Sequence, residues 1–392
     1  MIKRTVFPFI QKSWKRGKSI LLLGPRQTGK TTLAQSFSFD LTINFLSNSV
    51  RQAHEKNPDI ILKEVLALKK KGIALVLIDE VQKVPNIMDP IQYLIDKKKA
   101  QFFITGSSAR KLKQQADINL LPGRVISYRL ETLSLQEKPP EERDVESYLY
   151  YGQLPEIILE EDDTNKEELL QSYVEIYLEE EIRKEANLKN ISGFYHFLQF
   201  AAERSGHIIS YSGIAQDVGI SHVTVKSYYE ILESTLIADR IDPITFSKTR
   251  KKLIRSPRYL FFDMGVRRLA AKEGVKQPDS SKGLLFEQWV GLEILKYIRS
   301  NKIKATLHFW QDPEAAEVDW VIKKENTYIP IEVKLKSNIL PKELRHLNHF
   351  LEEYNCPKGG FVIFNGHHPQ QASAQITFQP WTQLIKLLES LF

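Results

Sequence analysis

A glycine-rich stretch near the amino terminus carries the strongest chemical signal in the sequence. It follows an apolar run at residues 19–23 and reads Gly24-Pro25-Arg26-Gln27-Thr28-Gly29-Lys30-Thr31-Thr32. The fixed positions fit the phosphate-loop pattern G-x-x-x-x-G-K-[ST], in which inward-facing N–H groups and the start of the next helix surround a polyphosphate. We therefore expect this stretch to bind a nucleotide. The alternative is an ordinary glycine-rich turn that contains a lysine.

Two carboxylates follow a second apolar run and complete the expected nucleotide chemistry. Residues 74–78 are apolar, and Asp79 and Glu80 come next, which is a Walker B pattern. Lys30 would reach the β- and γ-phosphates, while the Thr31 hydroxyl and Asp79 would hold Mg²⁺. Glu80 would polarise the water that attacks the γ-phosphate. The alternative is that the two acids simply begin a loop.

A pair of hydroxyl groups follows the next predicted strand. Residues 101–105 lead into Gly106, Ser107 and Ser108. Ligands of parallel sheets bind at the carboxyl ends of the strands, so Ser107 or Ser108 could orient the water or sense the γ-phosphate. Capping of a following helix is an equally simple role for either serine.

The segments that must position these residues alternate between strand-like and helical patterns. Residues 1–18 predict a short helix with an apolar stripe. Strands are expected at residues 19–23, 41–46, 73–78 and 101–105, with helical stretches at 60–70 and 87–97. This alternation predicts a parallel α/β sheet.

The middle of the chain has the spacing of a helix-turn-helix. Residues 211–232 predict a helix, a tight turn at Gly219 and a second helix that Ser221 caps. Base edges are usually met by the first exposed turns of such a second helix. The side chains expected there are His222, Thr224, Lys226 and Ser227.

Strand-like runs at 236–241 and 258–263 flank a basic loop, as in the wing of a winged helix. The cations of this loop are Lys248, Arg250, Lys251, Lys252, Arg255 and Arg258. They predict contacts with DNA phosphates that do not read sequence and that weaken with salt. The alternative is a module that binds protein or merely packs, with its cations solvated.

A single acid interrupts an apolar stripe near the carboxyl-terminal end. In the helix predicted at 283–298, Glu287 shares its face with apolar or small residues, namely Leu284, Val290, Gly291, Ile294 and Ile298. An ionised carboxylate in such a place costs several kcal/mol unless it is paired or bound to a metal. Glu287 therefore requires a partner.

Two later strands carry further acids. The first is predicted at 317–321 and contains Asp319, and the second is predicted at 328–335. The period of two places Glu332 and Lys334 together on one face of the second strand. An acid on a helix, an acid on one strand and Glu-x-Lys on the next resemble the PD-(D/E)xK nuclease core.

This resemblance implies that Asp319, Glu332 and Glu287 bind Mg²⁺. It also implies that Lys334 assists the attacking water or steadies the charged phosphate. Val318 stands in place of the proline in the motif's name, which leaves activity open. A salt-bridged strand surface and a nuclease fold that has lost cleavage are the alternatives.

Several segments together resemble AAA-superfamily P-loop ATPases of bacteria and archaea that carry a C-terminal restriction-endonuclease-like domain of unsettled role. The matching segments are residues 24–32, 79–82, 105–109, 121–124 and 151–156, and with the later segments they cover most of the chain. The resemblance implies ATP as the ligand, although the motifs alone do not separate ATP from GTP. It also makes Arg124 a candidate for the arginine that stabilises transferred phosphate, with an ordinary surface arginine as the alternative.

Composition and charge set the remaining expectations. The chain has 392 residues, 42% hydrophobic and 26% charged, which is typical of a globular protein and excludes a disordered chain. Its single cysteine, Cys356, forms no internal disulfide, and no apolar run approaches the ~20 residues of a membrane helix. We therefore expect a cytoplasmic protein.

Charge is unevenly distributed along the chain. The net charge is +7, yet residues 156–185 contain twelve acids against Lys166, Arg183 and Lys184, a local charge of −9. The basic character is therefore concentrated elsewhere, which permits nucleic-acid binding. The acidic segment is either a solvated helical face or a surface that docks a protein partner.

Together these patterns predict an α/β protein with three parts. Residues 1–140 form a P-loop ATPase domain of the AAA type, 141–275 a helical segment and winged helix, and 276–392 a PD-(D/E)xK-like domain. The expected function is an ATPase with ATP and Mg²⁺ as cofactors that binds DNA, with cleavage by the last domain left open. The competing expectation is an ATP-switched regulator of DNA or protein binding that does not cleave. An oligomer is compatible with both.

Overall fold

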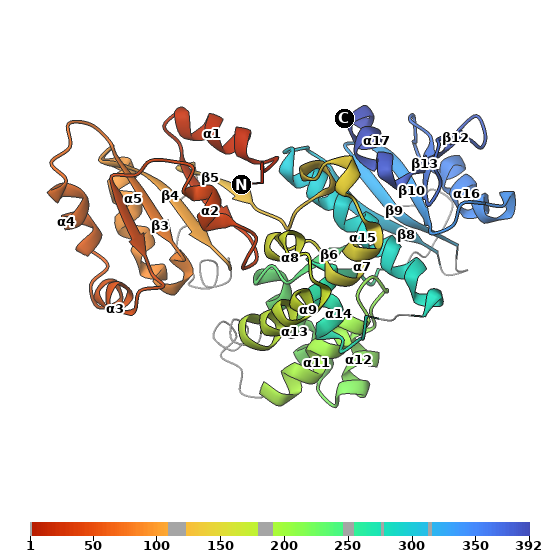
Figure 1. Cartoon of the computed structure of the whole chain (residues 1–392), viewed down its shortest axis with the longest axis horizontal. Coiled ribbons are helices and arrows are strands. Elements are labelled where there is room, and N and C mark those ends of the chain that lie inside the picture. Colours follow the sequence, from red (N-terminus) through yellow and green to blue (C-terminus); the bar gives the residue numbers. More distant parts are fainter. Residues whose placement is uncertain (1, 109–122, 179–190, 246–254, 276–277, 313–315) are drawn as a thin grey trace. The chain divides into compact units, whose positions relative to one another are not determined.

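The computed structural model describes residues 2–108, 123–178, 191–245, 255–275, 278–312 and 316–392 (Figure 1). Internal contacts divide the chain into two units. The first contains the described residues up to Thr132 together with Ile231–Ile237, and the second contains the remaining described residues. Among the described helices, none combines the length and the apolar composition that crossing a membrane requires.

The first unit is built on a sheet of parallel strands (Figure 1). In spatial order these are β2 (Leu41–Asn44), β3 (Ala74–Asp79), β4 (Ala100–Gly106), β1 (Ser19–Leu23) and β5 (Val125–Arg129). Its helices are α1 (Phe7–Lys15), α2 (Lys30–Ala34), α3 (Asn48–Lys56), α4 (Ile60–Ala67) and α5 (Met88–Asp96), with 3₁₀ turns η1 (Val81–Lys83) and η2 (Pro85–Ile87). The predicted parallel α/β sheet is confirmed.

Apolar side chains on both faces bury this sheet. Successive side chains of a strand point to opposite faces. Leu21 and Phe102 accordingly join a core on the side of α4 and α5, while Ile20 and Phe103 join a core on the side of α1 and α2. Strands buried on both faces read as continuous apolar runs. This explains why β1, β3 and β4 lie within one residue of their predicted bounds.

Strand β5 lies outside the sequence predictions. Its sequence, Val-Ile-Ser-Tyr-Arg, has no long apolar run and sits at the edge of the sheet. Pairing with β1 stabilises it, with Val125 opposite Ser19 and Arg129 opposite Leu23. The strand therefore depends on a partner more than a hundred residues away, which local pattern does not reveal.

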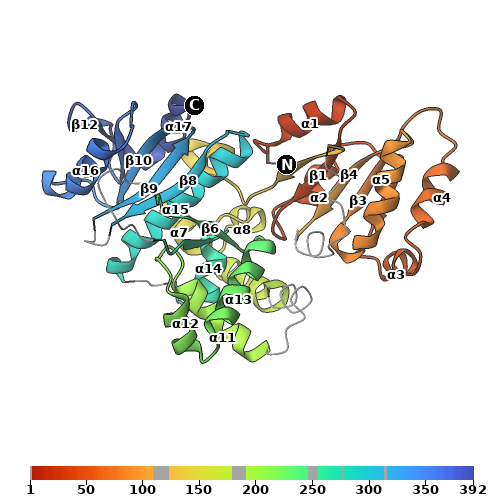
Figure 2. The ribbon, with the colours of Figure 1, turned by 180° about the vertical axis from the view of Figure 1, so that it is seen from behind.

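The second unit contains a mixed sheet (Figures 1 and 2). Its order is β12 (Gln370–Gln371), β13 (Ile376–Pro380), β11 (Gly360–Phe364), β10 (Thr327–Lys334), β9 (Glu317–Lys324) and β8 (Thr306–Gln311). The helices α15 (Asp279–Ser300) and α17 (Leu384–Leu391) pack on one face, and α16 (Arg345–Glu353) packs on the other. The strands β8, β9 and β10 are antiparallel, whereas β11 pairs in parallel with β10 and β13.

Helices and a hairpin precede this sheet in the chain. They are α7 (Val145–Tyr151), α8 (Pro155–Leu159), α9 (Asp163–Ser172), the π-helix η5 (Tyr173–Leu178), α11 (Ile191–Glu203), α12 (Tyr211–Val218), α13 (His222–Ser234), β6 (Ala238–Ile241), β7 (Arg258–Phe261) and α14 (Met264–Ala270). Short 3₁₀ turns are η3 (Leu135–Glu137), η4 (Pro140–Glu142), η6 (Pro341–Leu344) and η7 (Trp381–Gln383). Helix α9 is continued without a break by η5, after which residues 179–190 lie outside the described residues.

Helices α12 and α13 and the hairpin β6–β7 occupy the segment in which a winged helix was expected. The hydroxyl of Tyr211 in α12 lies 3.2 Å from that of Tyr259 in β7, and Phe197 of α11 packs against Tyr229 of α13. Tyr229 of α13 stacks on Tyr259 of β7 with ring centroids 4.2 Å apart. Gly219 ends α12 with φ of 74°, and the hydroxyl of Ser221 accepts a hydrogen bond from the N–H of Thr224 at 3.1 Å. Glycine permits this turn, and Ser221 caps α13.

Candidate functional site

The glycine-rich stretch forms a loop between β1 and α2. Its backbone turns sharply, since Gln27 and Gly29 have φ of 59° and 91°. A side chain at Gly24 would meet the carbonyl oxygen of Leu130, so only glycine fits there. Positive φ values and close backbone approach are what a loop needs to turn its N–H groups inward. The local sequence thus explains the shape of the loop.

Lys30 lies along the loop as the first residue of α2. Its Nζ donates to the carbonyl oxygens of Gly24 at 2.8 Å and Pro25 at 2.7 Å. The hydroxyl of Thr28 also donates to Pro25 O, at 2.9 Å. Lys30 is 6% exposed, and an ammonium held among loop carbonyls is placed to exchange them for phosphate oxygens. Of the remaining predicted loop residues, Pro25 is buried, Arg26 is half-buried, and Gln27 and Thr32 are exposed.

Thr31 and Asp79 meet at the carboxyl edge of the sheet, as predicted. The Thr31 hydroxyl donates to Asp79 Oδ2 at 3.1 Å, and Thr105 donates to Asp79 Oδ1. The Thr31 hydroxyl and the Asp79 carboxylate are oxygen ligands of the kind that Mg²⁺ prefers. Octahedral ligands ~2.1 Å from the ion lie ~3 Å from one another, which matches the Thr31–Asp79 separation. These two residues therefore fit a magnesium ion.

Glu80 is held by a residue to which the sequence assigned no role. Glu80 has φ of 62°, and its N–H donates to Thr105 Oγ1 at 3.2 Å. The side-chain amide of Gln82 donates to Glu80 Oε2 at 2.6 Å and to Ser107 Oγ at 2.8 Å. Gln82 thus links Glu80 to Ser107. The available signal was a polar residue two positions after Glu80, close behind the Walker B strand.

Arg124 does not lie near the phosphate loop of its own chain. It precedes β5, whose first residue, Val125, pairs with the first residue of β1, whereas the loop follows the last. Arg124 is therefore at the opposite edge of the parallel sheet. It forms an ion pair there with Asp96, with Nε–Oδ1 and Nη2–Oδ2 distances of 2.6 and 2.9 Å. Within its own chain, Arg124 is therefore not placed to act at the phosphate loop.

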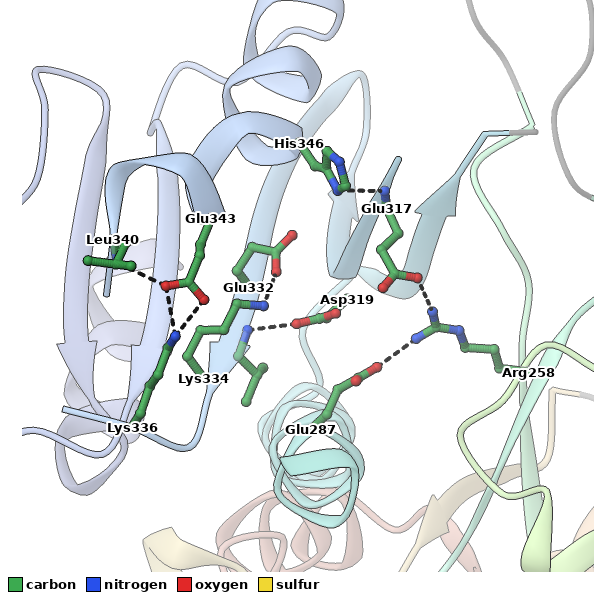
Figure 3. Close-up of polar contacts among 11 residues, drawn as sticks. Arg258, Glu287, Glu317, Asp319, Glu332, Lys334, Lys336, Leu340, Glu343 and His346 are labelled. Carbon is green, nitrogen blue, oxygen red and sulfur yellow. Dashed lines mark hydrogen bonds and ion pairs between the residues drawn. The ribbon is translucent and has the colours of Figure 1, made fainter. Parts of the chain in front are cut away.

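A second group of polar residues lies where α15 crosses β9 and β10 (Figure 3). Asp319 Oδ2 accepts the N–H of Val333 at 2.7 Å, and Lys334 Nζ donates to Glu332 Oε2 at 2.9 Å. Glu287 of α15 points toward Asp319, as Figure 3 shows. The structure therefore brings all four predicted residues, Glu287, Asp319, Glu332 and Lys334, to one place.

Arg258 is the partner that the isolated charge of Glu287 requires. Its guanidinium lies 2.7 Å from Glu287 Oε1 and 3.6 Å from Glu317 Oε2 (Figure 3). It also lies over the ring of Phe309, 4.5 Å from the centroid. Arg258 is 5% exposed, so the expectation that it contacts DNA phosphates with the other cations of the loop is wrong. The sequence signal was its position at the start of a strand rather than in the loop.

Burial and mutual repulsion perturb the acids of this cluster. Burial and the neighbouring Asp319 raise the pKa of Glu287 to about 8. The same two causes raise the pKa of Glu332 well above its ordinary value. Burial lowers the pKa of Lys334, but attraction to Asp319 and Glu332 outweighs burial, and the net shift is upward. Both shifted acids favour their neutral forms because negative charge is poorly solvated there.

The cluster in this arrangement does not fit a divalent metal ion. Each of Glu287, Asp319 and Glu332 has a protein partner, and no group of three or more His, Cys, Asp or Glu side chains in the described residues is arranged to hold a metal. The expectation that these three acids form a metal site is corrected on this point. Arg258 supplies positive charge at the position where the resemblance implied Mg²⁺.

The surface residues of the predicted DNA-binding part are only partly described. His222, Lys226 and Ser227 are exposed at the start of α13, and Thr224 is half-buried. Arg255 is exposed. The cations Lys248, Arg250, Lys251 and Lys252 lie outside the described residues.

The acidic segment 156–185 is described as far as residue 178. One of its acids, Glu167, is engaged by Arg268, with an Nη1–Oε1 distance of 3.0 Å. Glu161 and Asp162 are exposed, and Glu160 is half-buried. The acids thus divide between an internal ion pair and the surface.

Comparison with protein families separates the chain into three segments. Residues 16–138 match the family described as an AAA domain. Residues 142–277 match a domain of unknown function, DUF8612, and residues 282–384 match another, DUF4143. The first match, with the phosphate loop, supports a P-loop ATPase of the AAA type that binds nucleotide.

Individual relatives are distant. Uncharacterized proteins of Mycobacterium tuberculosis and Mycobacterium bovis are each 23% identical over 393 residues, covering 96% of this chain and 83% of theirs. The Pif1 helicase from Bacteroides, in complex with ADP-AlF3 and ssDNA, is 13% identical with a TM-score of 0.26, covering 45% of this chain and 50% of that one. The DNA clamp loader delta protein of Bacillus subtilis is 12% identical with a TM-score of 0.26, covering 58% and 87%. The chain thus spans half the length of the helicase chain.

Proposed function

We propose that this chain is a Mg²⁺-dependent ATPase whose turnover governs how its second unit binds DNA. The observation that carries the proposal is the convergence of Lys30, Thr31 and Asp79 from the loop, α2 and β3. The Thr31 hydroxyl lies 3.1 Å from Asp79. Residues far apart in the sequence thus meet in the arrangement that phosphoryl transfer requires.

Each residue of the site has a role that follows from its position. Lys30 leaves the loop carbonyls to bind the β- and γ-phosphates, and the N–H groups of the loop bind the phosphate oxygens. Thr31 and Asp79 hold Mg²⁺, which when bound neutralises charge that develops on the phosphate oxygens. Glu80, at the end of β3, polarises the attacking water.

The DNA-binding part of the proposal rests on α12, α13 and the hairpin. Ser221 caps α13, and the exposed His222, Lys226 and Ser227 lie at the end of the helix that meets base edges in helix-turn-helix proteins. The exposed Arg255 precedes β7, where a wing cation would contact phosphate. Such contacts supply affinity that falls with salt.

ATP turnover by Lys30→Ala tests the first half of the proposal. We expect turnover to fall at least ~100-fold, because the cation on the transferred phosphates is lost. Lys63→Ala, which removes an exposed lysine of α4, should leave turnover unchanged. Normal ATP hydrolysis by Lys30→Ala would show that the proposed catalytic site is wrong. Measuring GTP in parallel determines the preferred nucleotide.

DNA binding is tested separately. Lys226→Glu should weaken binding of duplex DNA and reduce the slope of log affinity against log salt by about 1, since one cation is removed from the end of α13 that faces the DNA. Lys304→Glu reverses an exposed lysine away from the helix-turn-helix and is the matched control. Equal DNA affinities for both variants and the wild type would show that α13 does not contact DNA.

A non-cleaving switch is the second candidate, and the Arg258–Glu287 pair favours it over a nuclease. Cleavage would require Glu287, Asp319 and Glu332 to hold Mg²⁺, which their present partners do not fit. In the switch, ATP occupancy changes binding of DNA or of a protein at the acidic segment, and hydrolysis is a slow reset. DNA cleavage with Mg²⁺ and ATP by the wild type, lost in Asp319→Ala, would restore the nuclease and exclude this candidate.

A further inference from the structure

Gln82 occupies an unusual place beside the proposed catalytic acid. It belongs to the turn η1, which follows β3 directly, and it is 3% exposed. Its single amide group donates to both Glu80 Oε2 and Ser107 Oγ, at 2.6 and 2.8 Å. Because Ser107 follows β4, Gln82 ties together groups from the ends of two neighbouring strands. One side chain thereby sets the distance between an acid and a hydroxyl at the carboxyl edge.

The backbone around Gln82 is shaped to admit its amide. Glu80 adopts the left-handed conformation with φ of 62°, which is costly for a residue other than glycine. At Gly106, an added Cβ would lie 3.0 Å from Gln82 Oε1. The amide of Gln82 thus lies between Glu80, whose backbone is strained, and Gly106, which has no side chain. Backbone strain of this kind is concentrated at functional sites.

The oxygen of the same amide is buried without a hydrogen-bond partner in the described residues. A buried acceptor without a donor costs free energy, and in native structures such an exception calls for an explanation. A methionine of similar length would avoid that cost, but it would donate nothing to Glu80 or Ser107. What glutamine supplies at this position is therefore the donor that joins these two groups.

We propose that Gln82 is a positioning residue for ATP hydrolysis. Its amide fixes the Glu80 carboxylate against Ser107, so that Glu80 holds one orientation toward the attacking water. The inference rests on the proposed function, because it assigns a role at the same site. It predicts that Gln82 acts on the chemical step and leaves nucleotide binding, which belongs to the loop and Lys30, unchanged.

The test compares Gln82→Met with the wild type and with Gln92→Met in the full chain. Gln92 is a half-exposed glutamine of α5 and serves as the matched control. For Gln82→Met we expect kcat to fall about 10- to 100-fold, with KM for ATP and the Kd for ADP within about threefold of wild type. Thermal unfolding should begin within a few degrees of the wild-type temperature, because removal of the unpaired amide oxygen offsets part of the loss of two hydrogen bonds. For Gln92→Met we expect no change.

A second background distinguishes positioning from a structural role. In Glu80→Gln, whose carboxylate is already absent, adding Gln82→Met should lower kcat no further, because Gln82 acts through Glu80. A full additional loss in that background would overturn the inference, as would a Gln82→Met kcat within twofold of wild type. A parallel loss of ADP binding would do the same.

The proposed function fails in a different way. If the wild type does not hydrolyse ATP, or Lys30→Ala hydrolyses it normally, the ATPase site itself is wrong. If Lys30→Ala is inactive while Gln82→Met turns over normally, only the role of Gln82 is wrong.

Discussion

Arg258 Nη1 lies 2.7 Å from Glu287 Oε1, and this pair joins the hairpin β6–β7 to the helix α15. The side chains of Arg258 and Glu287 are 6% and 18% exposed. Arg258 thus neutralises an acid that burial and Asp319 would otherwise leave uncompensated. The pair gives Glu287 the neighbouring positive charge that the resemblance to nucleases assigned to a metal.

Removing Arg258 should destabilise the second unit. We expect Arg258→Ala to lower the free energy of unfolding by at least about 2 kcal/mol, because the buried Glu287 side chain loses its hydrogen-bonding partner and Phe309 loses the guanidinium that lies over its ring. Urea unfolding followed by tryptophan fluorescence measures the change. Arg240→Ala on the same hairpin breaks an exposed pair with Asp242 and should cost at most about 1 kcal/mol. The loss from Arg258→Ala should shrink in a Glu287→Gln background, and an equal loss there would contradict the pairing.

The same pair predicts that the acid cluster takes up no divalent cation. Electron paramagnetic resonance of Mn²⁺, measured without nucleotide, should give the same binding for the wild type and for Asp319→Asn. The reason is that Glu287, Asp319 and Glu332 already have protein partners. A Mn²⁺ site present in the wild type and absent in Asp319→Asn would show that Arg258 yields its place to the metal.

Arg4 should support nucleotide binding although it lies outside the phosphate loop. Its Nη1 donates to Thr28 O and its Nη2 to Glu131 O, both at 2.6 Å. Arg4→Met removes two hydrogen bonds from a charged donor, so the loop loses support and ADP affinity should fall about 10-fold. The exposed neighbour Lys3, changed to Met, is the control. Isothermal titration with ADP measures both, and unchanged affinity for Arg4→Met would mean that the loop holds its own shape.

Gly152 should tolerate no side chain. Its φ is 73°, and a Cβ would meet the carboxylate of Asp263, which accepts the N–H of Gln153 at 2.7 Å. Gly152→Ala should therefore lower the free energy of unfolding by at least about 2 kcal/mol. Gly219 has a similar φ of 74° but open space around it, so Gly219→Ala should cost only about 1 kcal/mol. Equal losses at both positions would show that the backbone conformation alone decides the cost.

The nucleotide site was largely predictable because its parts are local. A phosphate loop is one continuous segment whose glycines and lysine act through the adjacent backbone. The segment from Gly24 to Thr32 therefore identifies the site from the sequence alone. Asp79 and Glu80 end a buried strand, and parallel strands end at one edge. By contrast, the hydrogen bond between Gln82 and Ser107 forms only because β3 and β4 are neighbours in the sheet. No pattern within either segment predicts that pairing.

The sequence by itself determined which residues needed partners, and the tertiary structure decided which partners they have. The apolar stripe of α15 shows that Glu287 must be neutralised, because a lone charge in an apolar face is costly. Whether a metal or an arginine does this depends on how the hairpin packs against α15, which brings Arg258 to Glu287 across 29 residues of sequence. For Arg124 the tertiary structure separates a residue from the site to which the sequence assigned it. The parallel pairing of β5 with β1 places its start, and Arg124 with it, at the edge away from the phosphate loop.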